Sequence, residues 1–159
     1  MDTFAQELND LLVETFWNIL KVEELMLQSG SGGDLSLSEL HVIESVGKSG
    51  EAGRTISEIA QDLDVALPSV TVQINKLQKK GYVEKHKNEM DGRVVNAKLT
   101  KQGQKMDTFH AFFHRQMVLA VAEGVDEKEK EVLIQGIKKL RNFFVKKSKS
   151  EYEKWDLQL

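Results

Sequence analysis

The 159-residue chain contains no cysteine, a single proline and no long apolar run. The lack of cysteine excludes disulfides, thiolate nucleophiles, cysteine-based zinc sites and any switch that works by thiol oxidation. The longest apolar candidate, Met117 to Ala122, is far shorter than the roughly 18 residues of a membrane span, and Met1-Asp2-Thr3 opens nothing like a secretory signal. We therefore expect a cytoplasmic protein with no membrane partner, and any signal that it senses must bind noncovalently.

Signatures of catalysis are also missing. The sequence has no glycine-rich phosphate loop and no nucleophile elbow, and its many carboxylates fall at expected helix starts and on polar faces, where capping accounts for them. With 40% hydrophobic and 30% charged residues, the chain has the balance of a globular protein and is long enough to bury a core. The sequence predicts a protein that is not an enzyme and holds no cofactor.

Residues 55–80 have the pattern of two helices joined by a tight turn. Thr55-x-x-Glu58 is a capping box, in which the Thr hydroxyl accepts from the N3 amide and the Glu carboxylate accepts from the cap amide. An apolar stripe at helical spacing follows. The turn leads to Pro68, whose fixed φ suits the first position of a second helix that runs to about Lys80.

The second of these helices has an inward and an outward side. Val70, Ile74 and Leu77 fall on one side of the wheel and should pack on the first helix. The other side offers hydroxyl, methyl, amide and ammonium groups, which are the groups that bind base edges and phosphates. The residues expected to contact DNA from this helix are Ser69, Thr71, Val72, Asn75, Lys76 and Lys79. Among them, the two lysines should hold phosphate, and Thr71, Val72 and Asn75 should select sequence.

Two short alternating segments, 82–87 and 94–99, predict a β-hairpin directly after the helix pair. Its tip contains Asp91 and Arg93. A hairpin beside a helix in the major groove would place Arg93 in the minor groove, whose negative potential favours a cation, with Asp91 as its brace. A helix pair alone is equally an ordinary αα-hairpin; with the hairpin it predicts a winged helix-turn-helix.

Charge is unevenly distributed, although the net charge is only −3. Residues 1–68 hold 3 Lys or Arg against 13 Asp or Glu, residues 69–105 hold 9 against 3, and residues 106–159 hold 10 against 9. A lysine-rich stretch is usually a solvated surface, but here the positive charge coincides with the elements that would face DNA. The distribution therefore favours double-stranded DNA as a partner.

Long helices are expected on both sides of this segment. The first, Phe4 to Gln28, is apolar on more than one face, so it needs a second partner, and in so short a chain another subunit is the natural one. The elements that follow it are a flexible connector over 29–33, a helix opened by the capping box Ser36-x-x-Glu39 and running to about Val46, and a loop over 47–53.

Two further helices, Lys101 to about Glu123 and Asp126 to about Lys149, are split at Gly124. The expected fold is mainly α with a small β-hairpin wing, an α+β winged helix-turn-helix. We expect residues 34–100 to form the DNA-binding domain, and residues 1–33 and 101–159 to form a helical dimerisation region in a homodimer.

Several runs of this sequence resemble the MarR family of bacterial transcription regulators. The runs that carry the resemblance are Leu77-Gln-Lys-Lys-Gly81-Tyr-Val-Glu, Asp91-Gly-Arg93-Val-Val and Leu99-Thr-Lys-Gln-Gly103. The runs that resemble its FabT branch of fatty-acid-synthesis repressors are Asn18-Ile-Leu-Lys-Val-Glu-Glu24, Glu39-Leu-His41 and Phe113-His114. The resemblance implies a two-fold dimer that represses from a pseudo-palindromic operator. For the FabT branch it implies long-chain acyl-acyl carrier protein as corepressor, held in an apolar tunnel.

Aromatic, methionine and histidine side chains outside the helix pair are the candidates for an effector site. Such residues are more often core or dimer interface than ligand contacts, and the resemblance raises the ligand option. The candidates are Trp17, Met26, His41, Phe109 and Phe113. Two alternatives remain open: a MarR regulator that a small aromatic or drug-like ligand releases from DNA, and a winged-helix module that binds protein instead of DNA.

His110 and His114 lie four residues apart on one expected helix face, a spacing compatible with a metal. Because no carboxylate accompanies them at a fixed spacing, we expect no metal site and interpret both as surface or pocket-lining histidines.

Overall fold

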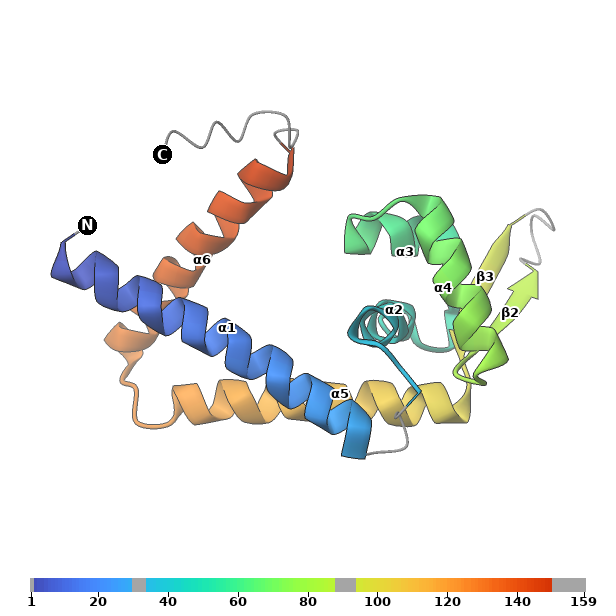
Figure 1. The fold of residues 1–159 in the computed structure, drawn as a ribbon, viewed down its shortest axis with the longest axis horizontal. Helices are drawn as coiled ribbons and strands as arrows, with labels where there is room; N and C mark the ends of the chain where they lie inside the picture. The colour runs from blue at the N-terminus through green and yellow to red at the C-terminus, as the bar shows by residue number, and fades with distance from the viewer. Residues whose placement is uncertain (1, 30–33, 88–93, 150–159) are drawn as a thin grey trace. The chain divides into compact units, whose positions relative to one another are not determined.

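The computed structural model describes residues 2–29, 34–87 and 94–149 (Figure 1). The elements, in chain order, are α1 (Thr3–Ser29), α2 (Leu37–Gly47), the 3-10 turn η1 (Gly50–Ala52), β1 (Arg54–Thr55), α3 (Ile56–Leu63), α4 (Leu67–Lys79), β2 (Val83–Lys87), β3 (Val95–Leu99), α5 (Lys101–Ala122) and α6 (Glu127–Lys149). The chain divides within α5 into two compact units, residues 1–112 and 113–159.

The core of the first unit forms where α2, α3 and α4 meet the small sheet. The hydrophobic side chains that are at most 1% exposed there are Val42, Ile43 and Val46 of α2, Ile59 of α3, Val70, Ile74 and Leu77 of α4, and Tyr82, Val83 and Ala97 of the hairpin region. This confirms the predicted inward side of α4. Because each fully buried aliphatic side chain contributes about 1.5 to 3 kcal/mol, the three buried residues of α4 hold this helix firmly on α2 and α3.

Both predicted capping boxes are confirmed. At α3, the Glu58 amide donates to Thr55 Oγ1 at 3.1 Å, and the Thr55 amide donates to Glu58 Oε2 at 2.8 Å. At α2, the Glu39 amide donates to Ser36 Oγ at 3.3 Å, and the Ser36 amide donates to Glu39 Oε2 at 2.9 Å. Each pair satisfies two amides that the first turn of a helix leaves without partners, and so fixes where the helix begins.

The sheet has three antiparallel strands in the order β1-β3-β2. The predicted hairpin is confirmed by β2 and β3, with Val83 opposite Leu99. The loop expected over 47–53 is partly wrong: α2 extends through Gly47, η1 occupies 50–52, and β1 then pairs Arg54 with Ala97. A two-residue strand has no periodicity that a sequence pattern can detect.

The helices outside the core agree with their predicted bounds to within one or two residues at each end. α1 has 27 residues, the first unit also holds the part of α5 up to residue 112, and α6 belongs to the second unit. None of the helices in the described ranges combines the length and the apolar character needed to cross a membrane. The division into a DNA-binding domain over 34–100 and a dimerisation region remains a prediction.

Candidate nucleic-acid interface

The turn before α4 determines how this helix leaves α3. Asp64, the C-cap of α3, has φ 54 and ψ 44, a left-handed conformation that Asp tolerates better than most residues. Ala66 precedes α4 in an extended conformation and supplies no side-chain cap, while Pro68 lies in the first turn. The chain thus reverses within three residues, and α4 packs across α3 (Figure 1).

The outward side of α4 is a row of accessible side chains. Ser69, Val72, Lys76 and Lys79 follow one another at intervals of three or four residues and are all exposed, as is Asn75 beside them. Val72 is 53% exposed, which leaves its methyl groups accessible to a thymine methyl. Thr71, at the edge of this row, is less exposed than the others and is half-buried. Its Oγ1 donates to the Leu67 carbonyl at 3.0 Å.

Asn75 is held by a residue that sequence reasoning missed. Lys85 of β2 donates from Nζ to Asn75 Oδ1, which connects the outward side of α4 to the wing. A carbonyl oxygen has two lone pairs and an amide nitrogen has two donors, so the side chain keeps one acceptor site and both donors for a base edge. No sequence spacing predicts this contact, because the two residues lie on different elements ten positions apart.

The three lysines near the end of α4 have different surroundings. Lys76 and Lys79 are exposed and form no ion pair with any residue that the structure describes. Lys80 instead donates to the Asp34 carbonyl and to Glu39 Oε2, the latter at 2.8 Å. Burial raises the pKa of Glu39, but the hydrogen bonds from Lys80 and Ser36 outweigh it and lower the pKa below its usual range. Lys80 therefore stabilises the fold, whereas Lys76 and Lys79 remain available for phosphate.

A second polar network, centred on Asp62, joins α3 to α2 and β1. Asp62 Oδ2 of α3 accepts from Ser45 Oγ at 2.7 Å, from Lys48 Nζ at 2.9 Å and from Arg54 Nη1 at 2.9 Å. The pKa of Asp62 is lowered to about 2, first by the hydrogen bond from Lys48 and then by that from Ser45. Arg54 also donates to the Ser45 carbonyl at 3.0 Å and to the Glu58 carbonyl at 3.3 Å. α2, β1 and α3 are thereby joined through one carboxylate.

The tip of the wing, residues 88–93, lies outside the described residues. The contact expected from Arg93, and the bracing role of Asp91, therefore remain predictions. The strands leading to the tip carry further cations, among them Lys87 and Lys98.

Comparisons with known proteins agree with this architecture. A family model described as MarR family matches residues 33–94. Streptococcus pneumoniae FabT, solved in complex with DNA, is 35% identical, with a TM-score of 0.81 over 89% of this chain and 98% of that chain. The chain belongs to the MarR family. Family members are DNA-binding regulators, so the prediction that the chain is not an enzyme is confirmed, as is the predicted fold.

Two other MarR-type proteins show how far the likeness extends. The HTH-type transcriptional repressor MdtR of Bacillus subtilis (strain 168) is 27% identical over 103 residues, which are 65% of this chain and 65% of MdtR. S. aureus MepR in a DNA complex is 19% identical with a TM-score of 0.66 over 84% of this chain and 95% of that chain, a likeness of fold alone.

The predicted effector residues of this MarR protein do not all come together. Trp17 is 64% exposed and Met26 is half-buried on α1, nine residues apart, which is about 13 Å along a helix. His41 of α2 lies beside His110, with 6.1 Å between ring centroids. Phe113 belongs to the second unit and stacks at a tilt on the next side chain, His114.

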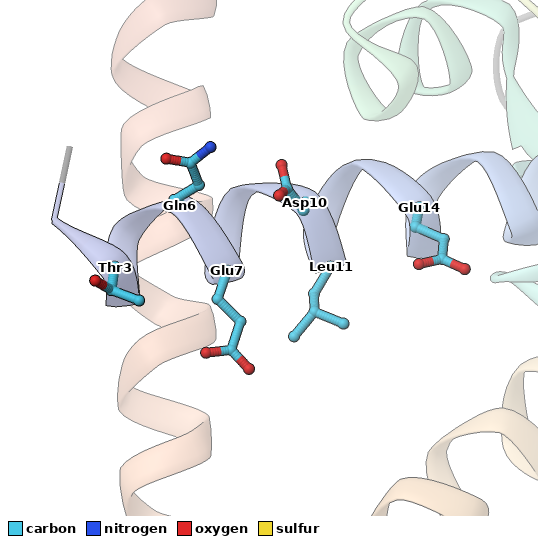
Figure 2. A pocket seen from close by; sticks show the side chains of 6 residues that line it. All are labelled: Thr3, Gln6, Glu7, Asp10, Leu11 and Glu14. Carbon is cyan, nitrogen blue, oxygen red and sulfur yellow. The ribbon is translucent and has the colours of Figure 1, made fainter.

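Phe109 lines a surface hollow along α5 that has an apolar and a cationic part. The residues around this hollow are Lys101, Gln104, Lys105, Thr108, Phe109 and Phe112. A hollow on α1 is different in character, as Figure 2 shows, because three of its six lining residues are acidic. Its lining residues are Thr3, Gln6, Glu7, Asp10, Leu11 and Glu14. An acyl chain bound there would take these carboxylates out of water, which costs free energy, so of these two hollows the one on α5 suits an acyl chain better.

His110 is not a surface residue. Its side chain is 2% exposed, and its Nε2 lies 3.1 Å from Oε1 of Glu23, whose side chain is 4% exposed. Of the two interpretations of His110, as a surface or a pocket-lining histidine, the surface alternative is wrong, because α1 supplies a buried carboxylate 87 positions away. Only the packing of α1 on α5 brings the two together.

Proposed function

We propose that the protein is a homodimeric transcriptional repressor that binds a pseudo-palindromic DNA operator through α4 and the β2-β3 wing. The observation that carries this proposal is the construction of α4. Three fully buried residues fix the helix to the core, and a continuous row of polar, methyl and ammonium groups lies on its opposite side. That arrangement suits a recognition helix in a major groove.

The dimer is supported by apolar side chains that the single chain leaves exposed. On α1, Phe4 is 72% exposed and Trp17 is 64% exposed; on α6, Val132 is 71% exposed and Phe144 is 61% exposed. Extended apolar surface of this kind marks an interface with another chain. In a two-fold dimer the two copies of α4 would meet half-sites about one helical turn, or about 34 Å, apart.

The first experiment identifies the operator by selection from random duplexes and then measures binding by fluorescence anisotropy. Asn75→Ala should cost about 1 to 3 kcal/mol on the operator and change little on random DNA, because a base contact is lost while phosphate contacts remain. Gln61→Ala removes an exposed amide of α3 and serves as the matched control. Equal losses on both DNAs would remove Asn75 from the residues that select sequence.

The same titrations test the proposed function itself. Binding through lysines releases counterions, so the affinity should fall steeply as salt rises. Duplex binding that is absent, or independent of salt, would overturn the repressor and favour a winged-helix module that binds protein. Sedimentation should give a dimer, and a monomer at the concentrations used for DNA binding would remove the homodimer from the proposal.

We propose further that the repressor controls fatty-acid-synthesis genes, with long-chain acyl-acyl carrier protein as corepressor. The likeness to FabT at 35% identity supports this role. The hollow on α5 supports it chemically, since Phe109 and Phe112 offer apolar walls while Lys101 and Lys105 suit the phosphate of the carrier's prosthetic arm. If the acyl chain binds the DNA-binding conformation of the repressor more tightly than its other conformation, then it must also tighten the binding of DNA.

The test adds carrier protein with short, medium and long acyl chains to the operator titration. Operator affinity should rise with chain length, by up to about 0.8 kcal/mol for each additional buried methylene. Phe109→Ala should reduce this gain and leave operator binding without the carrier unchanged. If no acyl-chain length has an effect and an aromatic acid such as salicylate releases the DNA, the hypothesis of a small aromatic ligand replaces that of an acyl corepressor.

A further inference from the structure

Three metal-binding side chains from three helices meet inside the first unit. Glu23 of α1, His41 of α2 and His110 of α5 each offer one ligand atom, and these three atoms lie within 4.8 Å of one another. Glu23 and His110 are buried, and His41 is half-buried. Neither DNA binding nor the apolar hollow on α5 uses this cluster.

The spacing of the cluster is close to that of a bound zinc ion. Bond lengths of about 2.1 Å at tetrahedral angles place ligand atoms about 3.4 Å apart. His110 Nε2 and Glu23 Oε1 are already 3.1 Å apart. Even three atoms all 4.8 Å apart would have a common centre about 2.8 Å from each, so shifts of well under 1 Å bring them to bonding distance.

The remaining nitrogen of His110 has the surroundings that a metal-bound imidazole needs. Its Nδ1 lies 3.6 Å from Glu44 Oε2, on α2. A ligating histidine usually directs its other N–H toward a carboxylate, which fixes the tautomer and makes the imidazole a better ligand. His110 thus has a carboxylate at each nitrogen: one that can share a metal and one that can orient the ring.

We propose that Glu23, His41 and His110 form a zinc site that joins α1, α2 and α5. Two imidazoles and one carboxylate, with a fourth position left for water, are a ligand set typical of Zn²⁺. Mg²⁺ and Ca²⁺ prefer all-oxygen sites, so they do not match. Because α2 packs on α3 and α4, a metal here fastens the helix pair to the first and fifth helices. The competing explanation is a buried Glu23–His110 ion pair that binds no metal.

The experiment uses the whole 159-residue chain after treatment with a chelator. Titration with Zn²⁺ against a chromophoric competitor should show one tight site per chain, and Zn²⁺ should raise the melting temperature because it binds only the folded state. Co²⁺ in the same protein should give the visible absorption bands of a tetrahedral N/O site. These measurements need no variant, so misfolding of a mutant cannot hide the answer.

Variants then assign the ligands. His41→Ala and Glu23→Gln should each weaken Zn²⁺ binding at least about 10-fold. Even the loss of a residue that only hydrogen-bonds a metal ligand typically weakens metal binding about 10-fold, so the loss of a ligand should cost no less. His86→Ala, which removes an exposed histidine of β2, is the matched control and should bind as the parent does. Circular dichroism confirms that each variant is folded.

Two results would overturn the proposal. The first is a parent protein that shows neither stoichiometric Zn²⁺ binding nor tetrahedral Co²⁺ bands. The second is a site that survives both ligand substitutions but is lost in His86→Ala, which would locate the metal on the wing. In either case the Glu23–His110 contact is an ion pair that serves packing alone.

Discussion

Lys79 and Lys80 are neighbours at the end of α4, yet the structure gives them opposite surroundings. Lys79 is exposed on the outward side, whereas Lys80 is bound to the Asp34 carbonyl and to the buried carboxylate of Glu39. Replacing each lysine with Met removes the ammonium and keeps most of the aliphatic stem. The two variants have the same composition, so any difference between them arises from position.

The magnitudes follow from these surroundings. Lys80→Met leaves Glu39, whose side chain is 6% exposed, without its cation. Loss of a charged hydrogen-bond partner from a buried carboxylate costs about 1 to 3 kcal/mol. At an m-value of about 2 kcal/mol/M, a loss of about 2 kcal/mol lowers the urea midpoint by about 1 M. Lys79→Met should change the free energy of unfolding by less than about 0.5 kcal/mol.

The effects on DNA binding should be the opposite of the effects on stability, with the larger loss in Lys79→Met. Each phosphate contact contributes about 0.9 to the slope of log K against log salt concentration. Lys79→Met should therefore flatten that slope by about one for each protomer, and it should weaken operator and random DNA alike. Lys80→Met should leave the slope unchanged under all conditions in which the variant remains folded. The measurements are urea titrations followed by circular dichroism and anisotropy titrations at several salt concentrations.

The refuting result is specific. If Lys80→Met flattens the salt slope as much as Lys79→Met does, then Lys80 leaves Glu39 to bind phosphate. If both variants unfold at the same urea concentration as the parent, the Lys80–Glu39 pair does not stabilise the fold. Either result would contradict the division between the two lysines that the structure shows.

Two further predictions concern stability. A Cβ at Gly103 would lie 2.1 Å from the Tyr82 carbonyl oxygen, so Gly103→Ala should lower the free energy of unfolding by about 1 to 3 kcal/mol. Gly136→Ala, in α6, meets nothing within 4 Å and should instead stabilise by up to about 1 kcal/mol; thermal melts that rank the two variants the other way would contradict this. For Asp62, a pKa lowered from 3.8 to about 2 means that its contribution is present above pH 4 and is lost as pH falls toward 2. Asp62→Asn should thus cost about 1 kcal/mol at pH 7, allowing for solvent screening, and less at pH 3; a cost that does not depend on pH would refute the assignment.

Local patterns made most of the fold predictable. The capping boxes at Ser36 and Thr55, and the burial of Val70, Ile74 and Leu77, depend on residues within one or two helical turns, so sequence spacing was sufficient. The outward side of α4 followed by elimination, once its inward side was known. The helix pair, the hairpin and the charge distribution already favoured DNA binding, and the family resemblance added the expected repressor role and its effector, which no spacing in this chain could supply.

The contacts that sequence reasoning missed join residues on different helices or strands, and two of them join distant segments. Lys80 to Glu39 spans 41 positions, and His110 to Glu23 spans 87. A histidine on an apolar helix has the same local pattern whether it faces solvent, a carboxylate or a metal. The pair His110 and His114 attracted attention by its spacing, but the partners of His110 lie on α1 and α2, and only packing could identify them.

The bond from Lys85 to Asn75 has a consequence for anyone who wishes to redirect this protein to a new operator. Exchanging α4 for a recognition helix that has no Asn at position 75 would remove the amide oxygen and leave the ammonium of Lys85, on the wing, without that acceptor. The helix and the strand beside it are therefore one unit of design. A library that varies positions 75 and 85 together should yield working hybrids more often than a library that varies α4 alone.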